Sequence, residues 1–354
     1  MPVASRFSLP LMAALLLGAG AASAQQQTPE SSVLHARTGP PSRTIHLDVL
    51  VTSKPGEPVT GLQQKDFTLL DDKTPREITS FEAVDGSKQP VEAILLIDSV
   101  NTPYTEVAQE RIQIERFLHA NGGKLALPTA LAVLSDSGVA IQGAYSRDGN
   151  GMAAGLDKYT ISLRAIGRSG GVEGAAERLD DSLKALRTLT AYEAQRPGRK
   201  IILWVSPGWP LLSGPGIQLS SHDQQTIFNE VTLLSTGLRE AQTSVYAINP
   251  LGIGESLQNV FYYQQFLGGV KRPNDVSIGN VALQVLATET GGLVLNSTDV
   301  ASLLQECVAD NAAYYRISFE PAPTEIRDVY HPLKVTVAKP DATAATSTGY
   351  YAEP

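Results

Sequence analysis

The chain has 354 residues, of which 42% are hydrophobic and 18% charged, which suits a globular protein with room for two domains and argues against disorder over most of its length. The net charge of −8, from 28 basic and 36 acidic residues, argues against a nucleic-acid-binding protein, because phosphates call for a basic surplus. With one cysteine, Cys307, and five scattered histidines, an intramolecular disulfide is impossible and a cysteine- or histidine-built metal site is poorly supported.

The first 24 residues have the pattern of a cleavable export signal. Arg6 supplies the positive charge, residues 9–22 form an apolar stretch shorter than the ~20 residues of a spanning helix, and Ala22-Ser23-Ala24 matches a small-residue cleavage site. We expect cleavage after Ala24 and no transmembrane anchor afterwards, so that the mature protein is periplasmic or secreted. Residues 25–43 are rich in Gln, Ser, Pro and Thr and are expected to form a flexible linker.

Short strands are expected at both ends of the folded part. Residues 44–51 alternate between apolar and polar side chains as a half-buried strand does. Further extended candidates are 67–70, 78–81, 314–319, 333–337 and 347–351. Three strands alone are marginally stable, so we expect residues 44–88 and 314–354 to combine into one small β-sandwich domain, with the central region inserted between them.

The central region, residues 89–313, alternates between strand and helix patterns, which predicts an α/β fold with an open sheet covered by helices on both faces. Strand candidates are 91–98, 131–134, 139–141, 200–206, 244–249 and 293–295. Helix candidates are 105–120, 172–194, 222–241, 281–290 and a segment that begins at Asp299. The turn Asp136-Ser137-Gly138 is so short that the third strand must run antiparallel to the second, leaving five parallel strands.

That order, with the second strand turning directly into an antiparallel third, resembles the von Willebrand factor A fold, a Rossmann-like open sheet. Short strings at residues 59–67, 206–208, 246–250, 288–292 and 349–352 also look like those of a bacterial family of exported von Willebrand factor A-related (VWFA-related) proteins, expanded in acidobacteria. Their shared order along the chain carries the resemblance, which implies a binding or adhesion function.

The resemblance also implies a metal-ion-dependent adhesion site at the C-terminal ends of the strands, where ligands bind in open α/β sheets. The first loop of the family pattern is Asp-x-Ser-x-Ser, and here it is Asp98-Ser99-Val100-Asn101-Thr102. Asp98 matches, Thr102 keeps a hydroxyl and Asn101 offers an amide oxygen, but Val100 removes one oxygen ligand.

The other two loops of the pattern are weaker. Ser169 is the nearest candidate for the threonine expected in the second loop, and the strand before the third loop ends in Ser206-Pro207-Gly208 without the expected aspartate. Since Mg²⁺ needs about six oxygens, we expect a degenerate site in which a weakly bound divalent cation is the only candidate cofactor. In the alternative, which we favour, Asp98 is structural and accepts hydrogen bonds from loop amides.

A catalytic alternative rests on one serine. Residues 167–171, Gly-Arg-Ser-Gly-Gly, match the Gly-x-Ser-x-Gly elbow of hydrolases, with Ser169 as nucleophile and His222 or His331 as base. No His-Gly-Gly-type oxyanion loop is present in the sequence. We therefore expect a non-enzymatic protein and keep a secreted serine hydrolase as the alternative.

Two long loops follow parallel strands at the same edge of the expected sheet, at residues 207–220 and 250–280. The candidate partner-binding side chains in them are Trp209, Leu211, Phe261, Tyr262 and Tyr263. Aromatic residues are favoured anchors in interfaces, so a protein or cell-envelope component is the expected partner. The equally weighted alternative is that these side chains cover the sheet edge or pack against the β domain. The sequence thus favours an exported binding, adhesion or scaffold protein, with a purely structural cell-envelope protein as a third interpretation.

Overall fold

The computed structural model of the chain describes residues 44–54, 56–86, 88–89, 91–159, 171–211, 219–252, 261–324 and 326–353. The expected export signal at 1–24, the expected linker at 25–43 and Ser169 lie outside the described residues. None of the described helices combines the length and the apolar character that a bilayer-crossing segment requires.

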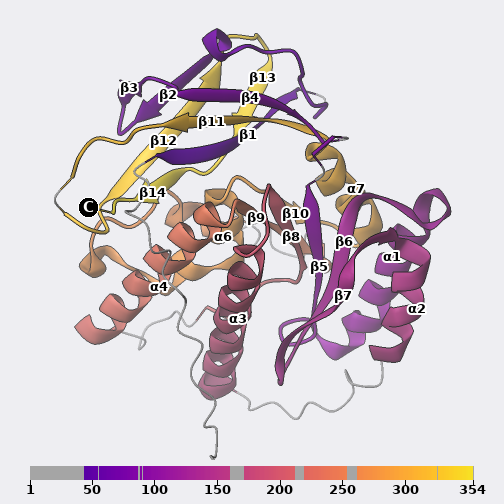
Figure 1. Ribbon diagram of the computed structural model, residues 1–354. Coiled ribbons are helices and arrows are strands. Elements are labelled where there is room, and N and C mark those ends of the chain that lie inside the picture. Colours follow the sequence, from indigo (N-terminus) through magenta and orange to yellow (C-terminus); the bar gives the residue numbers. More distant parts are fainter. Residues whose placement is uncertain are drawn as a thin grey trace, which may run out of the picture. The chain divides into compact units, whose positions relative to one another are not determined.

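A six-stranded sheet forms the centre of the fold (Figure 1), in the order β10-β9-β8-β5-β6-β7. Its strands are β5 (Glu92–Asp98), β6 (Lys124–Ser135), β7 (Gly138–Asp148), β8 (Lys200–Val205), β9 (Thr243–Asn249) and β10 (Val294–Asn296). All neighbours are parallel except β7, which pairs antiparallel with β6. The expectation of five parallel strands and one antiparallel strand is confirmed, and this is the arrangement that the resemblance to the von Willebrand factor A fold implies.

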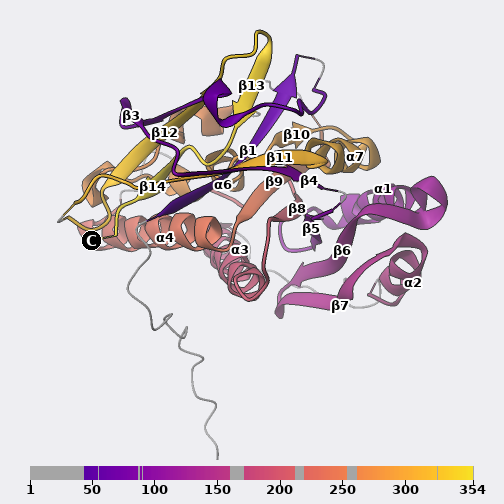
Figure 2. The ribbon, with the colours of Figure 1, turned by 45° about the horizontal axis from the view of Figure 1, so that its top comes forward.

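Helices cover both faces of this sheet because its central strands are apolar on both sides. Along β5, Ile94 and Leu96 point to one face and Leu95 and Ile97 to the other. Figures 1 and 2 show one group of helices on each face. One group is α1 (Tyr104–Gly123), α2 (Gly149–Tyr159) and α7 (Val300–Asp310), and the other is α3 (Gly171–Glu193), α4 (Ser221–Glu240) and α6 (Leu283–Glu289). The sequence did not predict α2.

Two four-stranded sheets, here called the terminal sheets, are built from both ends of the folded chain. The first has the order β13-β1-β11-β4 and the second β14-β12-β2-β3. Their strands are β1 (Ile45–Ser53), β2 (Phe67–Asp71), β3 (Thr74–Arg76), β4 (Ser80–Asp85), β11 (Ala313–Phe319), β12 (Tyr330–Val337), β13 (Ala342–Ala345) and β14 (Gly349–Tyr351). A 3-10 turn, η1 (Gln64–Asp66), precedes β2.

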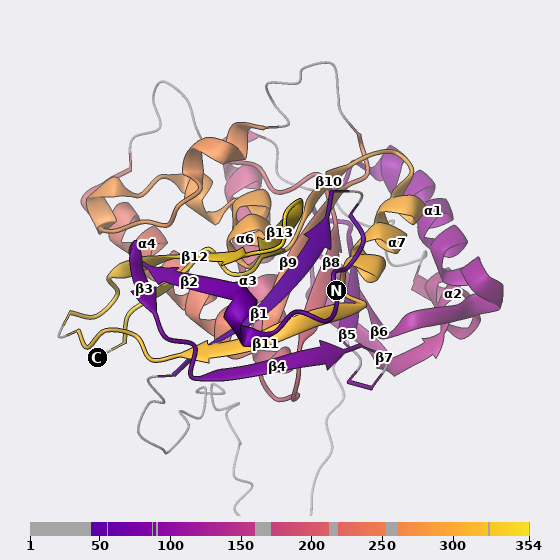
Figure 3. The ribbon, with the colours of Figure 1, turned by 90° about the horizontal axis from the view of Figure 1, so that it is seen from above.

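The pairing between early and late strands is direct. β1 runs antiparallel to β11, with Ile45 opposite Phe319, and β2 runs antiparallel to β12; Figure 3 shows β1, β11 and β4 side by side. One apolar cluster contains residues of both sheets, such as Leu47 of β1 and Leu69 of β2. The combination of terminal strands is therefore observed, with β3 and β13 as additional strands, whereas the division into a separate β-sandwich domain at the expected boundaries stays a prediction.

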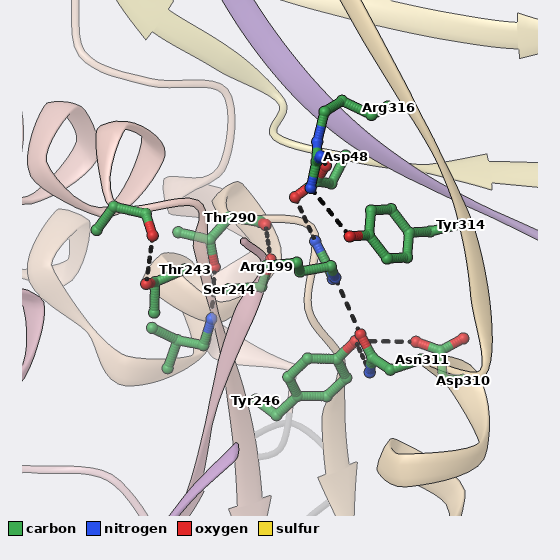
Figure 4. Close-up of polar contacts among 12 residues, drawn as sticks. Asp48, Arg199, Thr243, Ser244, Tyr246, Thr290, Asp310, Asn311, Tyr314 and Arg316 are labelled. Carbon is green, nitrogen blue, oxygen red and sulfur yellow. Dashed lines mark hydrogen bonds and ion pairs between the residues drawn. The ribbon is translucent and has the colours of Figure 1, made fainter. Parts of the chain in front are cut away.

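A polar network joins the first terminal sheet, through β1 and β11, to the amino-terminal end of β8 (Figure 4). Asp48 of β1 lies 3.2 Å from the guanidinium of Arg316 and 3.8 Å from that of Arg199, which precedes β8. Arg199 Nε also donates to Asn311 Oδ1 at 3.1 Å, and Asn311 Nδ2 donates to the Tyr246 hydroxyl at 2.8 Å. Because these groups are largely buried, their mutual pairing offsets the cost of removing them from water.

Candidate functional site

Asp98 lies at the carboxyl end of β5 and is fully buried. Its Oδ1 accepts hydrogen bonds from the backbone N–H groups of Val100 and Asn101, both at 2.9 Å. Its Oδ2 accepts from Asn101 Nδ2 at 2.8 Å and from the Trp204 indole Nε1 at 3.1 Å. The carboxylate thus already has four donors, two of them loop amides, which is the geometry of the structural alternative.

The other expected metal ligands have different surroundings. Asn101 Nδ2 also donates to Ser182 Oγ at 2.9 Å, and Ser206 Oγ accepts from the Gly208 N–H at 3.0 Å. Thr102 is 2% exposed and its hydroxyl has no hydrogen-bond partner within the described part of the chain. Among the described residues, no three His, Cys, Asp or Glu side chains are grouped so as to hold a metal ion. The degenerate metal site therefore stays a hypothesis.

One carboxyl near this loop was missed by sequence reasoning. Glu110 of α1 is 2% exposed. Burial raises the pKa of Glu110 well above its usual value, and the negative charge of Asp98 raises the pKa further, while the neighbouring Thr102 hydroxyl lowers it. No hydrogen bond of normal geometry reaches either carboxyl oxygen from the described residues. The sequence did contain a sign of this burial, because Glu110 occupies a position in the apolar stripe of its helix.

Trp209 lies in the core and not on the surface, which corrects its assignment as a partner-binding residue. It is 4% exposed, its indole Nε1 donates to the Val281 carbonyl at 3.0 Å, and its ring meets Trp204 edge-on with 5.3 Å between centroids. Leu211 is half-buried and packs against the same apolar cluster. An apolar side chain in a loop has no periodicity that distinguishes a core residue from a partner-binding one, and here Trp209 and Leu211 pack against the core.

The segment after β9 brings the other candidate residues together. It contains η3 (Tyr262–Phe266), η4 (Pro273–Asp275) and η5 (Ile278–Val281). The Tyr262 hydroxyl donates to Gln284 Oε1 at 3.0 Å, and Gln284 Nε2 donates to the Pro207 carbonyl at 3.2 Å. Burial raises the pKa of Tyr262 to about 12. Tyr262 therefore fastens the segment to the loop after β8.

Beside this anchor, apolar side chains of the same segment face solvent. Phe261 is 49% exposed and Leu267 37%. Tyr263 is half-buried, and its ring stands perpendicular to that of Tyr262, with 6.3 Å between centroids. We call Phe261, Tyr263 and Leu267, which lie in or next to η3, the post-β9 surface.

A buried carboxyl group also binds the backbone of the same segment. Glu289, at the end of α6, accepts a hydrogen bond from the Gly269 N–H at 3.0 Å, and burial raises the pKa of Glu289 to about 7. The next residue, Val270, donates its N–H to the Tyr351 hydroxyl of β14 at 3.1 Å. The segment is thus tied to both α6 and the second terminal sheet.

The two histidines of the hydrolase alternative lie on different elements. His331 of β12 has its Nδ1 3.2 Å from Asp71 Oδ1 and stacks on Tyr350 at 5.0 Å. His222 is exposed in the first turn of α4. Ser169, the expected nucleophile, lies outside the described residues, so the geometry of a catalytic triad remains a prediction.

Comparisons with known proteins find likenesses among solved structures but not in sequence. No protein family model matches the chain, and no curated protein matches it. Among solved structures, the chain is similar to the manganese-loaded TRAP protein of Plasmodium vivax, with 10% sequence identity, a TM-score of 0.32, and coverage of 77% of this chain and 98% of that chain. This likeness is too distant to carry an argument about fold or function, so the description of the fold rests on the strand order alone.

Proposed function

We propose that the protein is an exported, non-enzymatic binding or scaffold protein of the VWFA-related kind, which binds a protein or cell-envelope component at the carboxyl edge of its central sheet. The observation that carries the proposal is the post-β9 surface. Phe261 and Leu267 expose large apolar side chains on a segment whose backbone is fastened by Tyr262, Glu289 and Tyr351. An exposed apolar group on a fixed frame loses little conformational entropy on binding.

The proposal gives Asp98 a structural role, so binding should not require a metal ion. Its four hydrogen bonds support this view. The family membership and the export are supported by the sequence strings and by the signal pattern at the N-terminus.

A pull-down from cell-envelope extract, with and without EDTA, tests the proposal. The double variant Phe261→Ser/Leu267→Ser should recover much less of the captured component than the wild type, with an unchanged melting temperature. Ile112→Ser is the matched control, because Ile112 is 57% exposed on α1 and lies outside the post-β9 surface. Equal capture by the double variant and the wild type would refute the surface, and capture abolished by EDTA would refute metal independence.

The absence of enzymatic activity is also part of the proposal. An ester-hydrolysis screen of the full chain, with Ser169→Ala as control, is the direct test. Hydrolysis that disappears in Ser169→Ala would replace the binding function by the hydrolase alternative.

A further inference from the structure

A cavity of about 800 Å³ lies at the amino-terminal edge of the central sheet. Its walls are the carboxyl-terminal ends of α1 and α7, the start of β6 and the end of β4, and α1 and α7 lie side by side in Figures 1 and 3. Cavities of this volume commonly bind small molecules, especially where two parts of a fold meet. The post-β9 surface lies at the opposite edge of the sheet, so the cavity does not belong to the proposed partner-binding function.

The inner wall of the cavity is apolar. Phe117 of α1 and Leu125 of β6 line it and are 6% and 5% exposed. The buried polar residues of the lining have partners within the protein. Thr129 Oγ1 donates to a carbonyl of its own strand at 3.0 Å, and Asn311 Nδ2 donates to the Tyr246 hydroxyl at 2.8 Å. The inner wall therefore suits an apolar group.

Two exposed cationic side chains line the same cavity, Lys124 of β6 and Arg147 of β7. Arg147 Nη1 donates to the Leu125 carbonyl at 3.2 Å and also to the Ala126 carbonyl, which holds the guanidinium over the start of β6. In the part of the chain that the structure describes, Nε and Nη2 of Arg147 and the Lys124 ammonium group have no acceptor. A fixed guanidinium edge and a second cation are thus available to a ligand.

The acceptors around the cavity, by contrast, are already in use. Asp85, the acidic residue of the lining, has an interaction within the protein. Asp148, at the end of β7, accepts the Gly151 N–H at 2.9 Å. The last carbonyls of α7 accept the N–H groups of Asn311 and Ala312. The charge left for a ligand is therefore positive, and the two oxygens of a carboxylate match the parallel N–H groups on one edge of a guanidinium.

We propose that this cavity binds a fatty acid, with the acyl chain against Phe117 and Leu125 and the carboxylate on Arg147 and Lys124. Burial of the acyl chain supplies the apolar part of the affinity. Charge-assisted hydrogen bonds from the guanidinium fix the head group. The proposal does not rest on the partner-binding function.

Isothermal titration of the full chain with dodecanoate tests the site. The wild type should bind one dodecanoate, whereas dodecanol, which lacks the charge, and acetate, which lacks the chain, should each bind at least about tenfold more weakly. Arg147→Gln should also weaken dodecanoate binding by about tenfold or more, because a hydrogen bond to a charged group contributes that much. Lys334→Gln is the matched control, since Lys334 is an exposed strand lysine outside the lining, and it should bind as the wild type does.

A second variant tests the place independently of charge. Ala309 is exposed on the last turn of α7 and lines the cavity, so Ala309→Phe should block the acyl chain with both cations in place and the melting temperature unchanged. The proposal is overturned if the wild type shows neither heat of binding nor a thermal shift with dodecanoate, if dodecanol binds as tightly, or if either Arg147→Gln or Ala309→Phe binds normally. Binding that is kept in Ala309→Phe and lost in Phe261→Ser/Leu267→Ser would place the ligand on the post-β9 surface instead.

Discussion

Replacing Asp98 by alanine removes an acceptor that four donors share. Two of these donors, the Val100 N–H and the Trp204 indole N–H, are buried, and each bonds to Asp98. A buried donor left without a partner costs about 1–3 kcal/mol. We therefore expect Asp98→Ala to lower the free energy of unfolding by about 2–6 kcal/mol.

Graded variants sharpen this expectation. Asp98→Asn keeps one oxygen and presents an NH₂ group where the other stood, so it can serve only one pair of donors and should cost about half as much. Trp204→Phe removes one hydrogen bond to a charged group, worth about 1.5–3 kcal/mol, and adds the cost of the cavity left by the missing part of the fully buried indole. Asp180→Asn, on the exposed side of α3, is the matched control and should change stability by no more than about 0.5 kcal/mol.

Urea denaturation in the presence of EDTA is the assay, because the chelator removes any contribution from a bound ion. The structural role predicts a shift of the denaturation midpoint at unchanged m-value. A loss of less than about 1 kcal/mol for Asp98→Ala in EDTA would refute the reasoning and return Asp98 to the expected metal site.

Three further predictions concern the frame behind the post-β9 surface. Folding raises the pKa of Glu289 from 4.5 to about 7, so its contribution to the free energy of unfolding should be complete below pH 4.5. That contribution, about 3 kcal/mol, should be lost as the pH rises to about 7. Glu289→Gln should remove this pH dependence in denaturation curves measured across that range. Trp209→Ala should lower the free energy of unfolding by about 3–5 kcal/mol because the indole is buried, whereas Phe261→Ser should leave the melting temperature unchanged. A larger loss of stability in Phe261→Ser than in Trp209→Ala would contradict a buried Trp209 and an exposed Phe261. Gly269→Ala should lower stability by about 2 kcal/mol or more in thermal denaturation, because φ is +69° and the new Cβ would lie 2.3 Å from the ring of Tyr330.

The sheet could be predicted because its strands leave strong local patterns. Residues such as Ile201, Ile202 and Leu203 are apolar on both faces, and a parallel strand buried between helices requires that composition. The hairpin between β6 and β7 could also be predicted, since a turn at residues 136–138 permits only antiparallel pairing.

The candidate site was harder to predict because its contacts join residues far apart in the chain. The bond from Trp204 to Asp98 spans 106 residues, and no local pattern signals it. Loss of metal ligands at Val100 and Pro207 was readable from the sequence, and so was the role of loop amides as donors to Asp98, but the Trp204 donor was not. Glu110 was overlooked because a glutamate in a helix is normally exposed, although its spacing from Val107 pointed inward.

The terminal sheets set the order in which the chain can assemble. His46 of β1 contacts Ser318 of β11, 272 residues later, so the first strand has no partner in its own sheet until almost all of the chain is available. The central sheet and its helices need no such delay, because their strands pair over shorter separations. Folding should therefore proceed from the inside outward, with closure of the two ends as the late and slow step, and a chain truncated before β11 would leave β1 as an exposed edge with a tendency to aggregate.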